Sequence, residues 1–181
     1  MEKKGGAEPK NESSSEEDEP ENLSYKIIIV GNSTVGKTQM INRYCDNYFT
    51  KNYKKTIGVD FFQKRLELSA DINVSLQLWD VDGMSLTGKM LETYVHDANA
   101  IIFTYDITNL KSFADIDSWL REVSLVSTNN ASKDLPIKIL FGNKSDLNHI
   151  SQVEFEAHNN FAKDKGLQGY VGSAKTGDQV N

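Results

Sequence analysis

The sequence of 181 residues contains one cysteine, Cys45, so the chain cannot form an internal disulfide and fits a reducing, cytoplasmic compartment. It has no apolar stretch long enough to span a membrane and no signal peptide. Its second residue is Glu2, which excludes N-myristoylation. Its three histidines, His96, His149 and His158, lack metal-ligand spacing and are interpreted as surface or packing residues.

Positive charge is also scarce, since 20 lysines and arginines face 26 acidic residues and the net charge is −6. Most of the imbalance lies in residues 1–24, where eight acids stand against three lysines. This segment holds almost no apolar side chains, so we predict a disordered acidic leader over residues 1–24. The nearly neutral remainder has no basic stripe, and we expect no nucleic-acid partner.

Residues 25–181 are enough for one domain with a sizeable core. Apolar strand patterns alternate with helical patterns, which is typical of a mostly parallel α/β sheet. We predict helices over 37–46, along the stripe Phe113, Ile116, Leu120 and Val123, and after a capping box at Ser151–Glu154 that turns Phe155 and Phe161 inward. The predicted strands are 25–30, 60–68, 74–79, 100–106, 137–141 and 170–173.

A glycine-rich turn with the sequence GNSTVGKT follows the first predicted strand. It matches the P-loop pattern GxxxxGK[ST], with a buried strand before it and helix-forming residues after it. The glycines let the backbone wrap a phosphate chain with its N–H groups pointing inward, whereas a simple helix-capping turn would leave Lys37 unexplained. The Thr38 hydroxyl can ligate Mg²⁺. We therefore predict that phosphate is bound by Gly31, Asn32, Ser33, Thr34, Val35, Gly36, Lys37 and Thr38.

A second motif, Asn143-Lys144-Ser145-Asp146, lies at the carboxyl end of the fifth predicted strand. Ligands of doubly wound sheets bind over these strand ends. There the Asp146 carboxylate can accept two N–H bonds from the Watson–Crick edge of guanine, whereas adenine has no matching pair of donors. A polar group left unpaired by the wrong base costs about 1–3 kcal/mol. Alone the tetrapeptide is also typical of a solvated turn, but with the P-loop it predicts a guanine nucleotide.

These motifs make the chain resemble the Ras superfamily of small GTPases, and within it the Rab family, from Tyr25 to the end. The resemblance implies a monomeric P-loop G domain with a three-layer, doubly wound, mostly parallel six-stranded sheet that binds GTP or GDP with Mg²⁺. It implies that Phe49 packs on the guanine ring. The metal would be held by Thr38, Thr56 and Asp80, and the base would be met by Asn143, Lys144, Asp146, Ser173, Ala174 and Lys175.

The resemblance assigns catalysis to Lys37, Thr56, Gly83 and the position after that glycine, where the family has a glutamine that orients the attacking water. Here that residue is Met84, whose thioether is a weak acceptor and no donor. Asp82 replaces a small apolar residue and would lie close to the γ-phosphate. Either hydrolysis is slow, or Asp82 weakens γ-phosphate binding and favours GDP.

The Rab assignment rests on the run Ile57–Phe61 and on Phe61, Trp79 and Tyr94, which match an aromatic set read by effectors; plain packing of the hairpin would also explain these aromatics. The match is greatest to the Rab-twenty-eight subgroup, which is associated with cilia and membrane-coat traffic. The family implies an exchange factor and a TBC-type activating protein that brings its own arginine and glutamine, so assisted hydrolysis stays open.

Rab proteins continue after Ser173–Lys175 into a last helix and a prenylated tail, and the sequence contains neither. We therefore expect a G domain over 25–181 that is truncated before this helix and carries no membrane anchor. Three interpretations follow: a switch with slow hydrolysis, a scaffold that holds nucleotide without cleaving it, or a non-functional truncated product. An ATP-using P-loop kinase is contradicted by Asn143–Asp146.

Overall fold

In the computed structural model, which describes residues 20–52, 54–84, 89–127 and 135–180, six strands form a single sheet. Their order is β2-β3-β1-β4-β5-β6, and only β2 is antiparallel to its neighbour. This order confirms the predicted doubly wound, mostly parallel sheet. The strands are β1 (Glu21–Val30), β2 (Val59–Ser69), β3 (Ile72–Val81), β4 (Ala100–Asp106), β5 (Ile137–Asn143) and β6 (Gln168–Val171).

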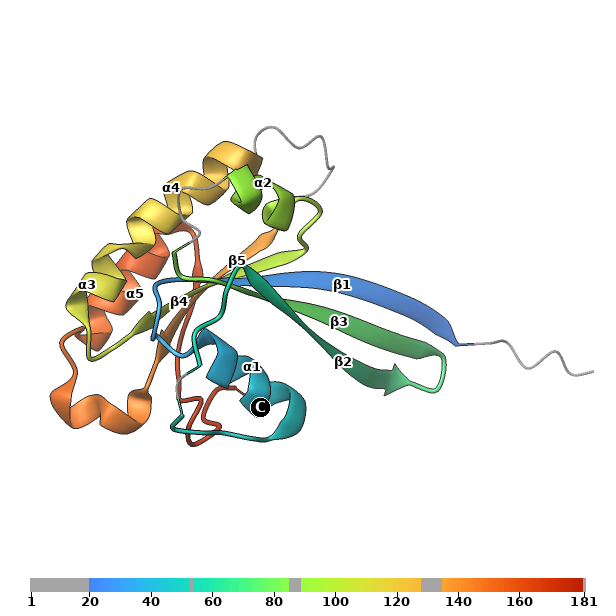
Figure 1. The fold of residues 1–181 in the computed structure, drawn as a ribbon, viewed down its shortest axis with the longest axis horizontal. Helices are drawn as coiled ribbons and strands as arrows, with labels where there is room; N and C mark the ends of the chain where they lie inside the picture. The colour runs from blue at the N-terminus through green and yellow to red at the C-terminus, as the bar shows by residue number, and fades with distance from the viewer. Residues whose placement is uncertain (1–19, 53, 85–88, 128–134, 181) are drawn as a thin grey trace, which may run out of the picture.

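Helices cover both faces of the sheet and complete three layers (Figure 1). Helix α1 (Lys37–Asp46) packs on one face. A short 3₁₀ helix, η2 (Ser145–Ile150), follows β5. On the opposite face lie α2 (Lys89–Val95), α3 (Leu110–Ala114), α4 (Ile116–Ser127) and α5 (Phe155–Lys165).

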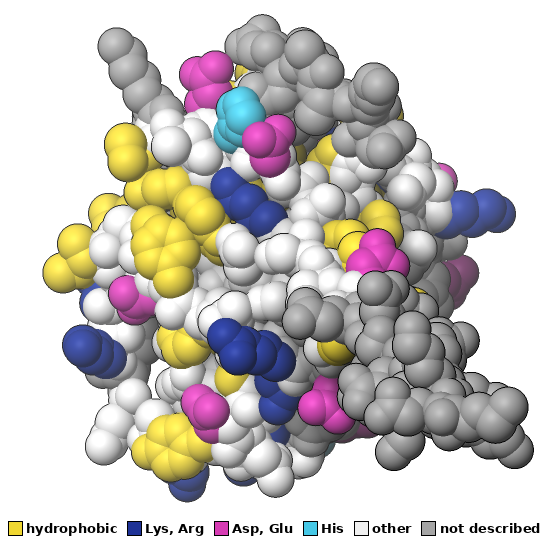
Figure 2. All heavy atoms as spheres, turned by 90° about the vertical axis from the view of Figure 1, so that its right-hand side faces the viewer, with side chains coloured by type: hydrophobic (Ala, Val, Ile, Leu, Met, Phe, Trp, Pro, Cys, Tyr) yellow, Lys and Arg dark blue, Asp and Glu magenta, His cyan; other side chains and the backbone are white. Residues whose placement is uncertain are grey.

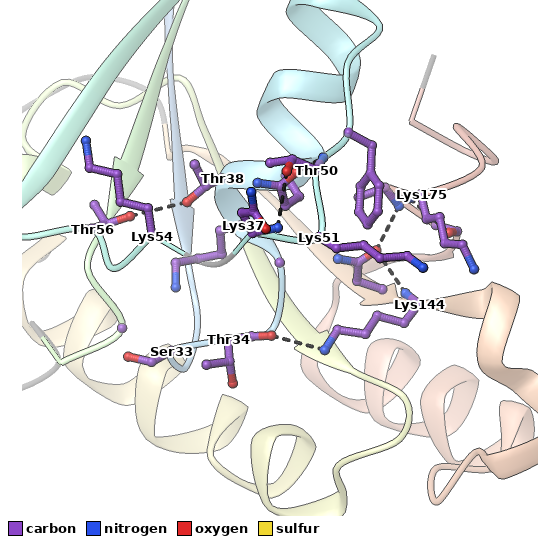
Figure 3. Close-up of a pocket in the computed structure, with 18 of the residues that line it drawn as sticks. Ser33, Thr34, Lys37, Thr38, Thr50, Lys51, Lys54, Thr56, Lys144 and Lys175 are labelled. Carbon is purple, nitrogen blue, oxygen red and sulfur yellow. Dashed lines mark hydrogen bonds between the residues drawn. The ribbon is translucent and has the colours of Figure 1, made fainter.

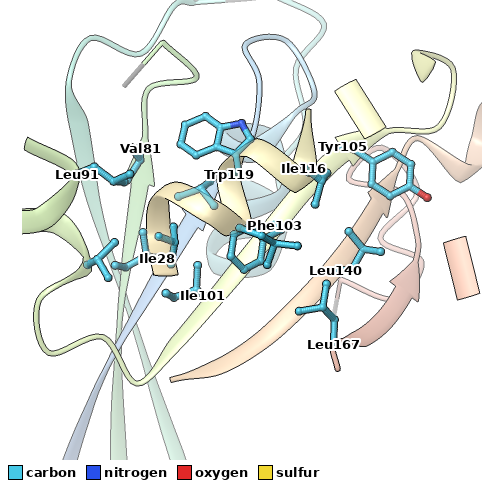
Figure 4. Packing of buried hydrophobic residues seen from close by; sticks show 14 of the residues in the cluster. Ile28, Val81, Leu91, Ile101, Phe103, Tyr105, Ile116, Trp119, Leu140 and Leu167 are labelled. Atoms are coloured by element: carbon cyan, nitrogen blue, oxygen red, sulfur yellow. The ribbon is translucent and has the colours of Figure 1, made fainter. Parts of the chain in front are cut away.

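Strand β4 divides its side chains between two cores, as its continuous apolar sequence predicts. Ile101, Phe103 and Tyr105 face the larger core, where Trp119 of α4 is fully buried (Figure 4). Ile102 faces the smaller core, which contains Met40, Ile41, Leu78 and Phe141. The predicted burial of β4 on both faces holds only in part: on the second face Thr104 is fully buried, whereas Ile102 is half-buried and lines an apolar groove.

The face of the sheet that α1 covers also carries an apolar groove of about 340 Å³ beside this helix. Strand residues such as Ile29, Leu78 and Ile139 line it, together with Tyr44 of α1 and Val180. Residues 172–180 form turns, and within the described part of the chain no helix follows β6.

The first strand is longer than its apolar pattern indicates. Glu21 pairs with Ile72 and the parallel register continues to Ile29, so residues 21–24 belong to the sheet and not to the expected leader. Three of these four side chains are polar, so the sequence carries no apolar strand pattern here; the backbone pairing with β3 holds the segment in the sheet. Residues 1–19 and the segment Ser85–Gly88 lie outside the described residues.

Two helix predictions were wrong in detail. The stripe from Phe113 to Val123 is carried by α3 and α4 and not by one helix, although it packs into the core as expected. Helix α5 begins at Phe155, and the Ser151 hydroxyl donates to carbonyl oxygens of Ile107 and Val153 instead of capping it. Phe155 therefore lies in the first turn, is 68% exposed and stacks on the His158 ring, while Phe161 packs inward as predicted.

His158 is a polar side chain within the larger core. Its Nδ1 lies 2.9 Å from the Tyr105 hydroxyl oxygen, while its Nε2 is buried and has no hydrogen-bond partner among the described residues. A charge on this ring would lack water and a counter-ion, so burial lowers the pKa of His158. The folded protein therefore holds the ring neutral.

We expect acid to destabilise the fold through His158. The unfolded chain binds a proton at a pKa of about 6.5 and the folded chain only at lower pH, so stability falls as the pH drops below about 6.5. His158→Gln should flatten this fall, whereas the same change at the exposed His149 should leave it intact. Urea denaturation between about pH 7 and 5 measures the free energy of unfolding. An equal fall of this free energy with pH in wild type and His158→Gln would contradict the role of His158.

Candidate nucleotide-binding site

A cavity of about 350 Å³ lies at the carboxyl ends of the parallel strands (Figure 3). Five segments of the chain enclose it: the P-loop between β1 and α1, the loop between α1 and β2, and the segments that follow β3, β5 and β6. Of the predicted site residues, those that line it are Ser33, Thr34, Gly36, Lys37, Thr38, Phe49, Thr56, Gly83, Asn143, Lys144, Asp146, Ser173, Ala174 and Lys175.

The P-loop glycines are required by backbone conformation and by close approach. Gly31 has φ of 137°, and a Cβ there would lie 2.0 Å from the carbonyl oxygen of Thr104. Gly36 has φ of 99°, and a Cβ there would lie 2.4 Å from Asn143 Nδ2. Gly31 therefore shapes the loop from behind the cavity.

Two further predicted binding residues also hold the loop without lining the cavity. Asn32 accepts a hydrogen bond from Trp119 Nε1 at 3.1 Å and donates to Asp115 Oδ2 at 2.7 Å. Val35 is 1% exposed. Asn32 anchors the P-loop on Trp119 of α4 and on Asp115 between α3 and α4, and Val35 anchors it in the core, so both residues contribute to its shape.

Lys37 lies at the centre of the P-loop and is 6% exposed. Its ammonium group donates to the carbonyl oxygens of Gly31 at 2.8 Å and Asn32 at 2.9 Å. Burial lowers the pKa of Lys37 to about 8, against the opposing charges of Asp80 and Asp82. An ammonium has three N–H donors, so one is free to meet a phosphate oxygen, whose charge would favour the protonated form.

Three oxygen-bearing side chains meet beside Lys37. The hydroxyls of Thr38 and Thr56 donate to Asp80 Oδ2 at 2.5 and 3.1 Å, and the two hydroxyl oxygens lie 3.2 Å apart (Figure 3). The other carboxylate oxygen, Asp80 Oδ1, is buried without a hydrogen-bond partner among the described residues. Burial raises the pKa of Asp80, while hydrogen bonds and the Lys37 charge act in the opposite direction. An all-oxygen set with an unsatisfied buried acceptor fits Mg²⁺.

At the opposite end of the cavity, the buried amide of Asn143 joins three loops. Its Nδ2 donates to the carbonyl of Val35 at 2.8 Å, and its Oδ1 accepts from the backbone N–H groups of Lys144 and Ala174 at 2.8 and 3.0 Å. Because every polar atom of the amide is engaged, Asn143 acts by holding the P-loop against the loops that surround the base site.

Lys144 adds a second link between the same loops. Its ammonium donates to Asp106 Oδ2 at 2.6 Å and to the carbonyl oxygen of Thr34 at 3.1 Å, the latter drawn as a dashed line in Figure 3. Asp106 is held in turn by the backbone N–H and the hydroxyl of Thr108. The aliphatic stem of Lys144 is thereby fixed along the cavity wall.

Asp146 presents the carboxylate that the sequence assigns to guanine. Oδ1 accepts from the Ser173 hydroxyl at 2.6 Å, and Oδ2 lies 3.1 Å from the Lys175 ammonium. Burial alone would raise the pKa of Asp146, but the bonds from Ser173 and Lys175 together lower it. An ionised carboxylate that is oriented from behind can accept the two N–H groups of a guanine edge.

The sequence analysis missed the lysines of the loop between α1 and β2. Lys51 and Lys54 line the cavity, and so do Gln39, Thr50, Asn52 and Leu147. The lining holds five lysines and two carboxylates, which favours an anionic ligand. The repeated lysines in the segment 51–55 were the signal that could have indicated this.

Met84, the predicted substitute for the catalytic glutamine, does not line the cavity. It is 68% exposed, and its sulfur lies 3.2 Å from the Lys55 ammonium. Asp82 and Gly83 do line the cavity, and Gly83 is pressed against the P-loop, since a Cβ there would lie 2.1 Å from the backbone nitrogen of Ser33.

The match to the Ras family extends over residues 26–181. This chain belongs to the Ras family. It is 40% identical over 165 residues to the Ras-related protein Rab-28 of Caenorhabditis elegans, a match that covers 91% of the chain and 65% of that relative. It is 34% identical to Rab-7L1 of Rattus norvegicus and 35% identical to human Rab-30, with 87% and 86% of the chain and 76% and 74% of those relatives covered.

Within the Ras family, the chain is a Rab-like small GTPase with particular similarity to Rab-28. It spans less than two thirds of the length of the C. elegans relative. No helix in the described part of the chain is long and apolar enough to cross a bilayer.

We expect Asp146→Asn to change base selectivity. One acceptor becomes a donor that faces the guanine amino group, so GDP affinity should fall about 10- to 100-fold. Xanthosine diphosphate, which carries a carbonyl in place of that amino group, should bind the variant more tightly than it binds the wild type. Titration with fluorescent nucleotides measures both. Asp178→Asn, outside the cavity lining, is the control, and unchanged GDP affinity of Asp146→Asn would contradict the role of the carboxylate.

Proposed function

We propose that this chain is a Rab-type switch that binds GTP and GDP with Mg²⁺ and hydrolyses GTP slowly on its own. The observation that carries the proposal is the meeting of the Thr38 and Thr56 hydroxyls at Asp80, at the phosphate end of a cavity whose other end presents Asp146. Thr38 belongs to the P-loop, whereas Thr56 lies on the loop before β2. A ligand at this point can therefore hold that loop closed or release it.

The chain's own groups account for the binding of a triphosphate. Lys37 brings a buried positive charge to the phosphate chain, and the N-terminus of α1 directs its backbone N–H groups toward it. When bound, Mg²⁺ supplies the additional positive charge that phosphoryl transfer requires. The backbone N–H of Asp82 donates to the carbonyl of Gly58 at 2.8 Å, so the segments before β2 and after β3 are joined beside the terminal phosphate.

Slow intrinsic hydrolysis follows from the chemistry and the place of Met84. A thioether cannot donate a hydrogen bond, so it cannot hold a water molecule in line with the phosphorus atom. Its exposure outside the cavity supports the same interpretation. Lys37 and the metal-holding residues are intact, which supports cleavage assisted by an activating protein that supplies the missing groups.

The partners that we propose are an exchange factor, a TBC-type activating protein and effectors, in a membrane-traffic role implied by the family. Phe61 is 62% exposed and packs edge-on against Trp79, which in turn contacts the buried Tyr94. A core-anchored aromatic stack with an exposed end supports recognition of the switch segments by another protein. On the face shown in Figure 2, lysine and arginine side chains are interspersed with acidic, neutral and apolar ones and form no broad basic stripe, a pattern that favours protein partners over nucleic acid.

A scaffold that holds nucleotide without cleaving it is the second candidate. Two observations favour it: Asp82 brings a negative charge to the cavity, and Met84 lies outside it. A time course of GTP conversion to GDP on the purified protein, alone and with an activating protein, separates the two functions.

We expect single-turnover hydrolysis by the wild type to be slower than that of Rab proteins with the usual glutamine. Met84→Gln should raise the rate at least tenfold, equivalent to about 1.4 kcal/mol of transition-state stabilisation. Met90→Gln is the control, because Met90 is 56% exposed on α2 and does not line the cavity. Phosphate release from preloaded protein is the measurement, and an ordinary rate in the wild type would refute slow hydrolysis.

A further inference from the structure

The two ends of the cavity would take different parts of a nucleotide. Asp146 and Lys175 lie where the base binds, and the P-loop surrounds the phosphates that follow. The terminal phosphate is the part of a nucleotide farthest from Asp146, so it reaches the end formed by Thr56, Asp82 and Gly83.

Asp82 brings a carboxylate to this phosphate end. Gly83 next to it is in backbone contact with Ser33 of the P-loop, and the backbone N–H of Asp82 is bonded to Gly58, so the main chain here has little freedom to withdraw. The carboxylate accepts a hydrogen bond from the backbone N–H of Met84 at 3.2 Å. Within the described part of the chain it forms no ion pair.

Three of the five lysines that line the cavity are held by other groups, and Lys51 and Lys54 of the loop between α1 and β2 complete the set. Lys37 is held by carbonyls of the P-loop, Lys144 by Asp106, and Lys175 by Asp146. The Asp82 carboxylate is close enough to Lys37 for their charges to interact. A diphosphate can share Lys37 with little interference, whereas a third phosphate adds negative charge beside Asp82.

We propose that Asp82 makes this chain selective for the diphosphate, so that the protein binds GDP much more tightly than GTP. The inference rests on the proposed nucleotide site and specifies which state of the switch is favoured. Asp82 acts through charge repulsion at the terminal phosphate and not through the volume of its side chain. The resting protein would then be in the GDP form, and a partner that displaces the segment around Asp82 would be needed to stabilise the GTP form.

Equilibrium titration of the full chain with GDP and with a nonhydrolysable GTP analogue, at saturating Mg²⁺, tests this proposal. Asp82→Asn keeps the shape and removes the charge, and it should tighten analogue binding about 10- to 100-fold while GDP affinity changes little. Asp82→Ala should have the same effect. Asp71→Asn, in the exposed turn between β2 and β3, is the matched control and should leave the affinity ratio of wild type unchanged.

Salt concentration supplies a readout that a steric role would not move. Raising the ionic strength screens the repulsion, so it should reduce the ratio of GDP affinity to analogue affinity in the wild type. The same ratio should change little with salt in Asp82→Asn. Rescue by Asp82→Ala without rescue by Asp82→Asn would overturn the role of charge. If the wild type binds GDP and the analogue with equal, tight affinity, the proposed preference for the diphosphate is wrong, and the proposed nucleotide site still stands. Loss of GDP binding in every variant would overturn the site itself.

Discussion

The buried side chain of Asn143 is the interaction on which the whole site depends. The P-loop is 108 residues away from Asn143 in the sequence and the segment after β6 is 31 residues away, and both of them and the turn after β5 make a backbone hydrogen bond to this amide. Backbone groups in such a position must be paired, because each one left unsatisfied costs about 1–3 kcal/mol. The amide thus sets how far the phosphate-binding loop stands from the base-binding loops. Gly36 is required by the same contact, since a side chain there would displace the Asn143 amide.

Three carboxylates near the cavity act differently because their surroundings differ. Asp146 is backed by Ser173 and Lys175 and is therefore a fixed acceptor for N–H groups. Asp80 is buried behind two threonine hydroxyls with one oxygen unsatisfied, which suits an atom that shares its charge with a cation. Asp82 has only a backbone N–H for a partner among the described residues and lies at the open end of the phosphate site. On the proposed binding mode, the first two would attract parts of the ligand, and the third would act against its last phosphate.

Much of this arrangement could be predicted from local sequence. The P-loop and the motif at 143–146 each follow directly on an apolar strand, and β4 is recognised by its own continuous apolar run. Residues 21–24 could not be predicted as strand, because their pairing with β3 is a backbone property of a distant segment. The prediction that Phe155 points inward was wrong because it depended on where α5 begins. The Ser151 hydroxyl donates to the carbonyl of Val153 and does not cap the helix. The role of Asn143 was predicted as contact with the base, whereas its three backbone partners become visible only when the loops are brought together.

The segments before β2 and after β3, which would respond to nucleotide, are joined to each other, so a substitution at position 82 or 84 can affect both. Thr56 is joined to the end of β3 through Asp80, and Gly58 is joined to Asp82 through the backbone, so movement on one side of the phosphate site is transmitted to the other. A charge at position 82 therefore acts on both segments at once. Met84 follows the glycine that contacts the P-loop, yet its side chain lies against Lys55 on the outside. The residues proposed to bind the nucleotide and Mg²⁺ are thus in place, and the departures from the family pattern fall at the point proposed for recognition and cleavage of the third phosphate.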